Sequence, residues 1–222
     1  FNPEARRIDF GISSYIIPGD GPVPVRYRVT GPNGEVVLDK KDAFRHRDSS
    51  RITLPAERGG VYRIHVDSTK WFAWTEPAVP MVLAGSPTGE GGHRFPLEIG
   101  VDRHWFFKVP KGTDQFTVTA GVANPRHVLS CEIHAPDRIA DILYVRGGEP
   151  RKVTMKVPAG LDDKVWFFRL GVGSATRFLG DNPLQPQHVR IDADIHLHGV
   201  PGYLAPTWSQ WFLPRAAAAG GQ

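Results

Sequence analysis

Lys108–Asp114 reads KVPKGTD, and the same pattern returns as KVPAGLD at Lys156–Asp162. Each stretch lies beside an aromatic run, WFFK at residues 105–108 and WFFR at residues 166–169. Pro and Gly favour turns, whereas aromatic and β-branched residues favour strands. Each repeat therefore predicts a strand, a Pro-Gly turn and a further strand, and the pair favours a β-sandwich over a helical or doubly wound fold.

The composition also favours a turn-rich β protein. The 222 residues include 24 Gly and 20 Pro, which is well above the usual combined share of about 12%. Such an excess is also found in disordered chains, but a hydrophobic share of 41% and six Trp indicate a folded protein. At this length the chain forms either one large domain or two of ordinary size.

The first part of the chain, residues 1–87, shows the short strands and frequent turns of an immunoglobulin-like sandwich. Val25–Val29 alternates strictly, with Val and Tyr on one side of the predicted strand and Arg on the other. Gly31–Gly34 (GPNG) predicts a hairpin turn, and Val61–Asp67 alternates in the same way. These features predict an antiparallel β-sandwich.

The rest of the chain predicts a linker, a second sandwich and a tail. Residues 88–94 are Gly-rich and lack an apolar anchor, which indicates a flexible linker. Residues 95–215 contain about seven or eight short strand patterns, which predict a sandwich of the jelly-roll type. Residues 216–222 indicate a disordered tail. The expected fold is therefore all-β, with tandem antiparallel β-sandwiches.

Charge and cysteine content narrow the classes of partner. The net charge of +4 comes from scattered Lys and Arg, without the basic stripe and interleaved aromatics that nucleic-acid binding favours. No run approaches the roughly 18 apolar residues of a membrane span.

Cys131 is the single cysteine, expected in a buried strand, so no intrachain disulfide can form. That is compatible with the cytosol and with secreted bacterial proteins that lack disulfides. The chain begins at Phe1 rather than Met, which leaves room for a removed targeting peptide.

Residues 95–172 resemble the bacterial pre-peptidase C-terminal (PPC-like) domain and related jelly-roll carbohydrate-binding modules. The matching stretches are Trp105–Thr113, Phe116–Thr119, Ala140–Val145 and Val165–Leu170. The resemblance implies a non-catalytic accessory region of a large secreted polysaccharide-degrading enzyme, covalently linked to a catalytic domain. It also implies a secreted location, extracellular or periplasmic.

One departure from the family pattern concerns calcium. An additional predicted strand, Val128–His134, lies where the family usually passes directly to an Asp-rich strand. This affects the segment of the family's occasional calcium site, so calcium is left open, and no other cofactor is expected.

The clearest metal-ligand pattern is DADIHLH at Asp192–His198. His196 and His198 lie two residues apart, so in a strand they share a face and, with a third ligand, could bind zinc or copper. Alternatively, Ala193, Ile195 and Leu197 face a core, and the Asp and His residues form the solvated side. Glu132 and His134 repeat the spacing.

No catalytic residues are predicted. Gly171–Ser174 lacks the Gly-x-Ser-x-Gly pattern of a nucleophile elbow and is not followed by a helical pattern. The acidic pair Asp162 and Asp163 lies in a predicted turn. A glycosidase needs two carboxylates that face each other across a cleft, and the sequence alone does not place such a pair.

Aromatic residues near predicted strand ends are the candidate ligand-binding groups. Indole and phenol rings offer flat apolar surfaces with a polar edge, on which the C–H face of a sugar ring can stack. The candidates are Trp71, Trp74, Tyr203, Trp208 and Trp211. Alternatively, the tryptophans seal a sandwich edge or the interface between the two predicted sandwiches. Trp105 and Trp166 are instead predicted to lie in the core.

Three functional hypotheses follow. The first is a non-catalytic module that binds polysaccharide by aromatic stacking, as part of a larger secreted carbohydrate-active enzyme. The second is a structural spacer or protein-interaction module. The third is a small metal-dependent enzyme that uses the His-x-His pair of residues 196 and 198.

Overall fold

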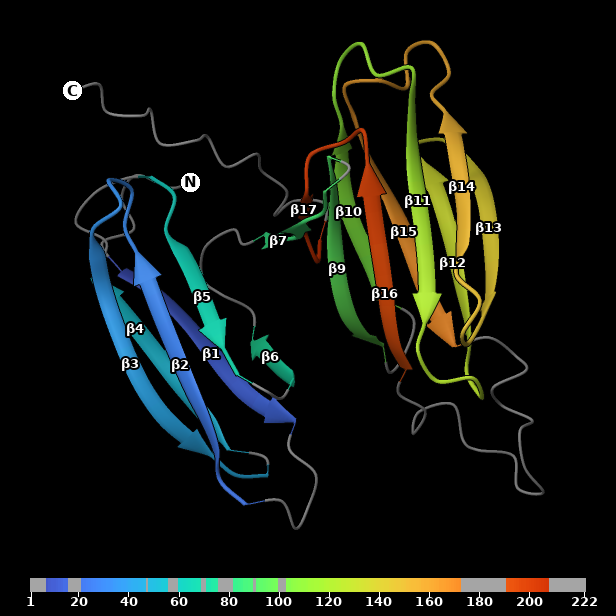
Figure 1. The fold of residues 1–222 in the computed structure, drawn as a ribbon. Coiled ribbons are helices and arrows are strands. Elements are labelled where there is room, and N and C mark those ends of the chain that lie inside the picture. The colour runs from blue at the N-terminus through green and yellow to red at the C-terminus, as the bar shows by residue number, and fades with distance from the viewer. Residues whose placement is uncertain are drawn as a thin grey trace. The chain divides into compact units, whose positions relative to one another are not determined.

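The computed structural model describes residues 7–15, 21–46, 48–55, 60–68, 71–75, 82–89, 91–99, 103–172 and 191–207. Within these residues the regular secondary structure is entirely β-strand, and the strand pairings are antiparallel. The described residues up to Thr75 belong to one compact unit, and those from Val82 onward belong to a second (Figure 1). The predicted all-β fold with tandem sandwiches is confirmed.

The described residues of the first unit form two three-stranded sheets. Its described strands are β1 (Arg7–Tyr15), β2 (Val23–Thr30), β3 (Val36–Phe44), β4 (Ser49–Pro55), β5 (Arg63–Asp67) and β6 (Trp71–Thr75). The sheet orders are β4-β1-β6 and β3-β2-β5. Strand β2 alternates between buried and exposed residues as predicted, and both sheets bury their inner side chains in one core. The predicted GPNG turn joins β2 to β3, with Gly34 at a φ of 85°. The immunoglobulin-like assignment stays a prediction.

The second unit contains eight long strands and three very short ones among its described residues. The long strands are β9 (Gly92–Ile99), β10 (Arg103–Val109), β11 (Gln115–Val122), β12 (Val128–Ala135), β13 (Arg138–Arg146), β14 (Arg151–Lys156), β15 (Lys164–Val172) and β16 (Ile191–His198). The short strands are β7 (Leu83–Ala84), β8 (Ser86–Pro87) and β17 (Tyr203–Leu204). Strand β8 extends one large sheet beside β9, while β7 and β17 pair with each other.

The order of the long strands is that of a jelly roll. One sheet has the order β10-β15-β12-β13 and the other β14-β11-β16-β9. Counted along the chain, the second sheet therefore contains the sixth, third, eighth and first long strands. Consecutive strands alternate between sheets except at the β12–β13 hairpin, which is the double Greek-key arrangement of a jelly roll. The jelly-roll prediction is confirmed by this topology.

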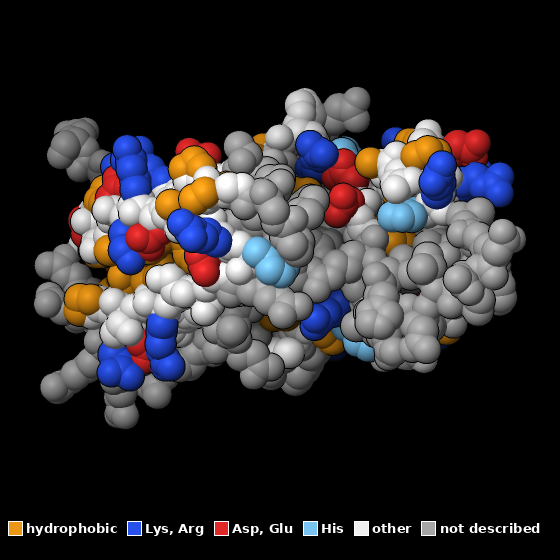
Figure 2. Space-filling model, turned by 90° about the horizontal axis from the view of Figure 1, so that it is seen from below, with side chains coloured by type: hydrophobic (Ala, Val, Ile, Leu, Met, Phe, Trp, Pro, Cys, Tyr) orange, Lys and Arg blue, Asp and Glu red, His pale blue; other side chains and the backbone are white. Residues whose placement is uncertain are grey.

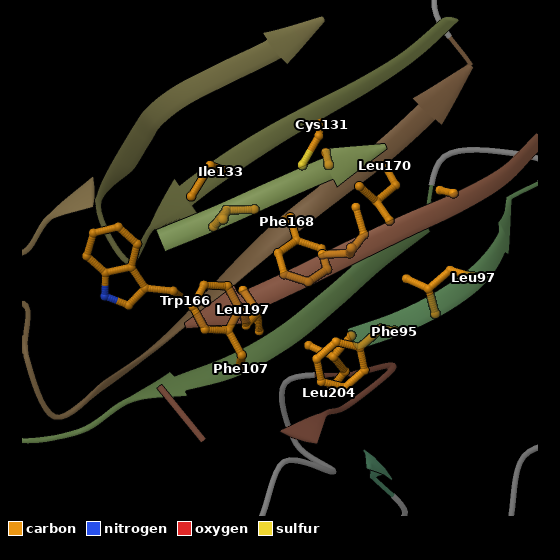
Figure 3. Close-up of a cluster of buried hydrophobic side chains, with 14 of the residues drawn as sticks. Phe95, Leu97, Phe107, Cys131, Ile133, Trp166, Phe168, Leu170, Leu197 and Leu204 are labelled. Carbon is orange, nitrogen blue, oxygen red and sulfur yellow. The ribbon is translucent and has the colours of Figure 1, made fainter. Parts of the chain in front are cut away.

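The core of the second unit is an aromatic cluster between the two sheets. Phe107 lies 5.3 Å from Phe168 and 5.5 Å from Phe116, measured between ring centroids. Trp166 meets Phe116 edge-on at 5.2 Å, and its indole N–H donates to the Leu161 carbonyl oxygen at 3.0 Å. Figure 3 shows the rings of Phe107, Trp166 and Phe168 with Leu and Ile side chains from both sheets. Trp166 is fully buried and Trp105 is half-buried against the core, so the prediction of core positions is confirmed.

The two KVP repeats form turns that lie against each other. Each turn has a Gly in the left-handed region, Gly112 at φ 78° and Gly160 at φ 82°. The backbone N–H of Gly112 donates to a carboxylate oxygen of Asp162 at 2.9 Å. The Val157 N–H donates to the Asp114 carbonyl oxygen at 2.8 Å. The repeated pattern thus marks two adjacent turns at one end of the jelly roll.

The Gly-rich segment predicted as a linker at residues 88–94 has a different structure. Its last residues, 92–94, lie in β9, where Arg94 pairs with Ser86 of β8 and with His196 of β16. The Thr88 N–H donates to the Gly92 carbonyl oxygen at 2.9 Å, which closes a turn in which Gly91 has a φ of 73°. The glycines serve this turn, so the flexible linker is wrong for residues 92–94. The predicted tail, residues 216–222, lies outside the described residues.

Charged groups are interspersed on the described surface. Figure 2 shows Lys and Arg next to Asp and Glu on one side of the molecule. The closest pairs include Arg26 with Asp39 at 2.6 Å and Arg94 with Asp194 at 2.8 Å. Among the described residues there is no helix long and apolar enough to cross a membrane.

Cys131 is an inert core thiol. Its side chain is fully buried in β12, and burial raises its pKa to about 12. Because the thiolate is the reactive form, we expect native protein at neutral pH to resist iodoacetamide and denatured protein to react with one equivalent. Mass spectrometry of the two samples measures this. Rapid labelling of the native protein would contradict the buried position.

A buried tyrosine anchors a small polar network in the first unit. Tyr27, fully buried in β2, donates its hydroxyl to Asp42 of β3. Lys40 lies 2.9 Å from the same carboxylate, and its ammonium lies 5.6 Å from the centroid of the Tyr27 ring. The hydrogen bonds from Tyr27 and Lys40 lower the pKa of Asp42.

Since the pKa of Asp42 is lowered by folding, its stabilising contribution is present above the unfolded value of about 4 and disappears as the pH falls through the folded value. We expect Asp42→Asn to lower the free energy of unfolding at pH 7 by about 1 kcal/mol. The difference from wild type should shrink below about pH 4. Urea unfolding across this pH range tests both points, with exposed Asp67→Asn as control. A difference that grows in acid would be inconsistent with this network.

Candidate functional site

The outer side of the β10-β15-β12-β13 sheet carries a cluster of aromatic and apolar side chains. In β10 and β15, the buried residues Phe107, Trp166 and Phe168 face the core. Because neighbouring residues of a strand face opposite sides, Phe106 and Phe167 face outward. We call this surface the aromatic face, and its residues are His104, Phe106, Glu132, His134, Ile139, Ile142, Tyr144, Phe167 and Arg169.

The first row of the aromatic face runs straight across the four strands. Phe106 is paired with Phe167, Phe167 with His134, and His134 with Ile139. The Phe106 and Phe167 rings lie 5.2 Å apart, and the His134 ring stacks on Phe167 at 4.3 Å with an interplanar angle of 12°. With strands about 4.8 Å apart, this row spans about 14 Å.

A polar row lies beside the aromatic one. Glu132 of β12 is paired with Arg169 of β15, which in turn is paired with His104 of β10. One oxygen of Glu132 lies 3.0 Å from the His134 ring nitrogen Nε2, and the other lies 3.6 Å from the Arg169 guanidinium. The His104 ring also meets Phe167 edge-on at 5.4 Å. Glu132 therefore fixes a basic group on one side and the stacked imidazole on the other.

Strand β13 adds apolar side chains that are open to solvent. Tyr144 is 66% exposed, Ile139 is 52% exposed and Ile142 is 39% exposed. Exposed apolar side chains are ordinary when single, but a group of them on one face marks a contact surface. The aromatic face thus combines flat rings, hydrogen-bonding groups and exposed apolar area, which suits non-covalent binding of a ligand with apolar and hydroxyl surfaces.

The residues predicted to bind ligand are only partly described. Tyr203 is half-buried in β17, where it pairs with Ala84. Two residues later Ala205 exchanges two backbone hydrogen bonds with Phe106, at 2.9 and 2.8 Å, and so borders the aromatic face. Trp71 and Trp74 lie in β6, but their side chains are outside the described part. Trp208 and Trp211 lie outside the described residues altogether.

The His-x-His pair lies on the outer side of the other sheet. His196 and His198 share this side of β16, and their rings are 6.5 Å apart and nearly parallel. Ala193, Ile195 and Leu197 are buried, as the solvated-strand alternative predicted. Asp194 lies 3.5 Å from His196. Within the described part of the chain, no three His, Cys, Asp or Glu side chains form a group that could hold a metal ion.

The sequence contained the signal for the aromatic face. In WFFK and WFFR, a core position for Trp and for the second Phe places the first Phe on the opposite side of the strand. The predicted ligand-binding residues are four tryptophans and Tyr203, and they do not include Phe106 or Phe167. Sequence alone could not show that the two residues are directly paired, because strands β10 and β15 are distant in the chain.

No family model and no curated protein sequence matches the chain. The resemblance to the PPC-like domain therefore stays a prediction. Solved structures with a similar arrangement include the N-terminal CBM22-1–CBM22-2 tandem domain from Paenibacillus barcinonensis Xyn10C, at 11% identity and a TM-score of 0.23. That match covers 86% of this chain and 78% of the other.

Two viral structures are similar at the same low level. The infectious bursal disease virus Gx strain matches at 9% identity with a TM-score of 0.21, covering 90% of this chain and 60% of that one. The VP2 subviral particle of the same virus matches at 12% identity with a TM-score of 0.21, covering 89% and 59%. Likenesses at these TM-scores indicate no function for this chain.

The Phe106–Phe167 contact should be measurable as an energetic coupling. We expect a double-mutant cycle of Phe106→Ala and Phe167→Ala to give about 0.5–1.5 kcal/mol of coupling in the free energy of unfolding. The matched control is a cycle of Phe106→Ala with Tyr144→Ala, whose strands are separated by two others, and it should give a coupling near zero. Equal couplings in both cycles would argue against direct contact between the two Phe rings.

Proposed function

We propose that this protein is a non-catalytic module that binds polysaccharide on the aromatic face of its jelly roll. The observation that supports this most directly is the continuous row of Phe106, Phe167 and His134, which presents three adjacent rings on neighbouring strands. Pyranose rings have an apolar C–H face that stacks on such rings, while their hydroxyls need hydrogen-bonding partners. The neighbouring Glu132 and Arg169 provide an acceptor and a donor for them.

The expected affinity is modest. A few stacked rings and hydrogen bonds correspond to a dissociation constant of about millimolar to micromolar, or about −4 to −8 kcal/mol. Covalent linkage to a catalytic domain compensates, because it raises the effective concentration of that domain at the polysaccharide. The proposal therefore includes a larger secreted enzyme of which this chain is the accessory region, located outside the cytoplasm. The support for this part is the resemblance of residues 95–172.

A second candidate function is docking of a protein partner. The exposed side chains of Ile139, Ile142 and Tyr144 favour it, because protein interfaces are rich in aromatic residues and bury apolar area at their centre. The module would then be a spacer or interaction domain. The charged pair of Glu132 and Arg169 beside the ring row favours polysaccharide, which needs polar partners distributed along its length.

Affinity electrophoresis of the whole chain against β-glucan, xylan and polygalacturonate tests the proposed function. We expect at least one polysaccharide to retard the protein and Phe167→Ala to weaken binding by about tenfold or more, since one stacked ring contributes about 1–3 kcal/mol. Phe167→Tyr, which keeps a stacking ring, is the matched control and should retain binding. Trp71→Ala, Trp74→Ala, Tyr203→Ala, Trp208→Ala and Trp211→Ala are tested in parallel.

The outcomes separate the site from the function. Retardation that is insensitive to Phe106→Ala and Phe167→Ala but sensitive to a Trp variant would move the site to that tryptophan. A panel in which no polysaccharide retards the protein would contradict the proposed function and leave the protein-docking alternative.

A further inference from the structure

The second sheet of the jelly roll presents a polar surface on its outer side. On the outer side of β14, β11, β16 and β9, Lys152 is paired with Thr119, Thr119 with His196, and His196 with Arg94. We call this surface the polar face. Its residues are Arg94, Gln115, Thr117, Thr119, Lys152, Thr154, Lys156, Asp192, Asp194, His196 and His198. These four strands lie side by side in Figure 1.

Positive charge is concentrated on the β14 side of the polar face. Lys152 and Lys156 are exposed, and neither forms an ion pair with another described residue. On β9, by contrast, the Arg94 guanidinium lies 2.8 Å from the Asp194 carboxylate, so its charge is compensated. Exposed Asp192 adds a negative charge on the same side of β16, where it is paired with Glu98 of β9. The face is therefore basic at β14, whereas acidic residues offset the positive charge at β16 and β9.

Hydrogen-bonding groups fill the space between these two sides. The Thr117 and Thr154 hydroxyls lie 3.1 Å apart on neighbouring strands. His198 is paired with Gly92, and a Cβ atom at residue 92 would collide with the His198 ring, so this glycine lets the ring lie across its strand. Ammonium groups, hydroxyls and imidazole N–H groups are all donors for carboxylate or sulfate oxygens.

We infer that the polar face binds the carboxylate or sulfate groups of an anionic polysaccharide, with Lys152 and Lys156 as the charged anchors. The ligand lies across β14, β11 and β16, where Thr117, Thr119 and His198 donate hydrogen bonds to it. A nucleic acid is less well suited, because single strands bind by base stacking and the outward positions of this face hold no Phe, Tyr or Trp among the described residues. The choice of polysaccharide among polyanions rests on the proposed function.

Binding of polygalacturonate and of dextran sulfate to the whole chain, measured by titration calorimetry at low salt, tests the inference. The first ligand supplies carboxylates and the second supplies sulfates. We expect the double variant Lys152→Gln/Lys156→Gln to weaken binding of at least one of them by about tenfold. The matched control is Lys111→Gln/Lys164→Gln, which removes the same charge at exposed positions away from the polar face and should change affinity less than about twofold.

Three outcomes would overturn the inference. Equal weakening by both double variants would mean that net charge alone attracts the polyanion. Unchanged binding in Lys152→Gln/Lys156→Gln would place the anion elsewhere. Tighter binding of single-stranded oligothymidylate with the same sensitivity would assign the face to nucleic acid.

Phe167→Ala is included as a separate arm. If this variant still binds polygalacturonate or dextran sulfate but no longer binds β-glucan or xylan, the aromatic face and the polar face are separate binding sites. If wild type binds neither β-glucan nor xylan but still binds the anionic ligands, only the proposed function of the aromatic face is contradicted.

Discussion

The alternation of side chains across strands β10 and β15 is the constraint on which both the core and the candidate site depend. Trp166, Phe168 and Phe107 are buried between the sheets as part of the apolar core of the second unit. Because successive side chains face opposite sides, this burial forces Phe167 and Phe106 outward. The same two strands therefore supply the hydrophobic stabilisation of the fold and the rings of the aromatic face. A one-residue shift in register would exchange the two sets.

The two sheets of the jelly roll share one core but differ on their outer sides. The β10-β15-β12-β13 sheet presents rings and exposed apolar groups, with Glu132 holding His134 and a neighbouring cation. The other sheet presents Thr, His and Lys side chains without large apolar groups at those outward positions. Because the packed core separates the two outer sides, the side chains on one side can differ in chemistry from those on the other. One jelly roll thus presents two chemically different surfaces.

The turns that join the strands are fixed by local contacts as well as by backbone preference. Gly112 and Gly160 permit the left-handed conformation, and Asp162 then links the two turns through the Gly112 N–H. Lys108 adds a 2.7 Å contact with Asp163. These bonds connect the β10–β11 turn with the β14–β15 turn. Each turn passes from one sheet to the other, since β10 and β15 belong to one sheet and β11 and β14 to the other. They therefore tie one end of the sandwich together where the core ends.

The sequence by itself determined the all-β class, the turn at each KVP repeat, and the core positions of Trp166 and Cys131. These follow from local preferences and from period-two alternation, which need no knowledge of the partner strands. The prediction of a linker was wrong for residues 92–94, which lie in β9. Gly-rich stretches are typical both of flexible linkers and of tight turns, so composition does not distinguish the two. Only the tertiary structure decided which outward residues become neighbours. Phe106 meets Phe167, and Thr119 lies between Lys152 and His196, through pairings between strands far apart in the chain. Such registers depend on the packing of the whole core and have no signature in any single segment.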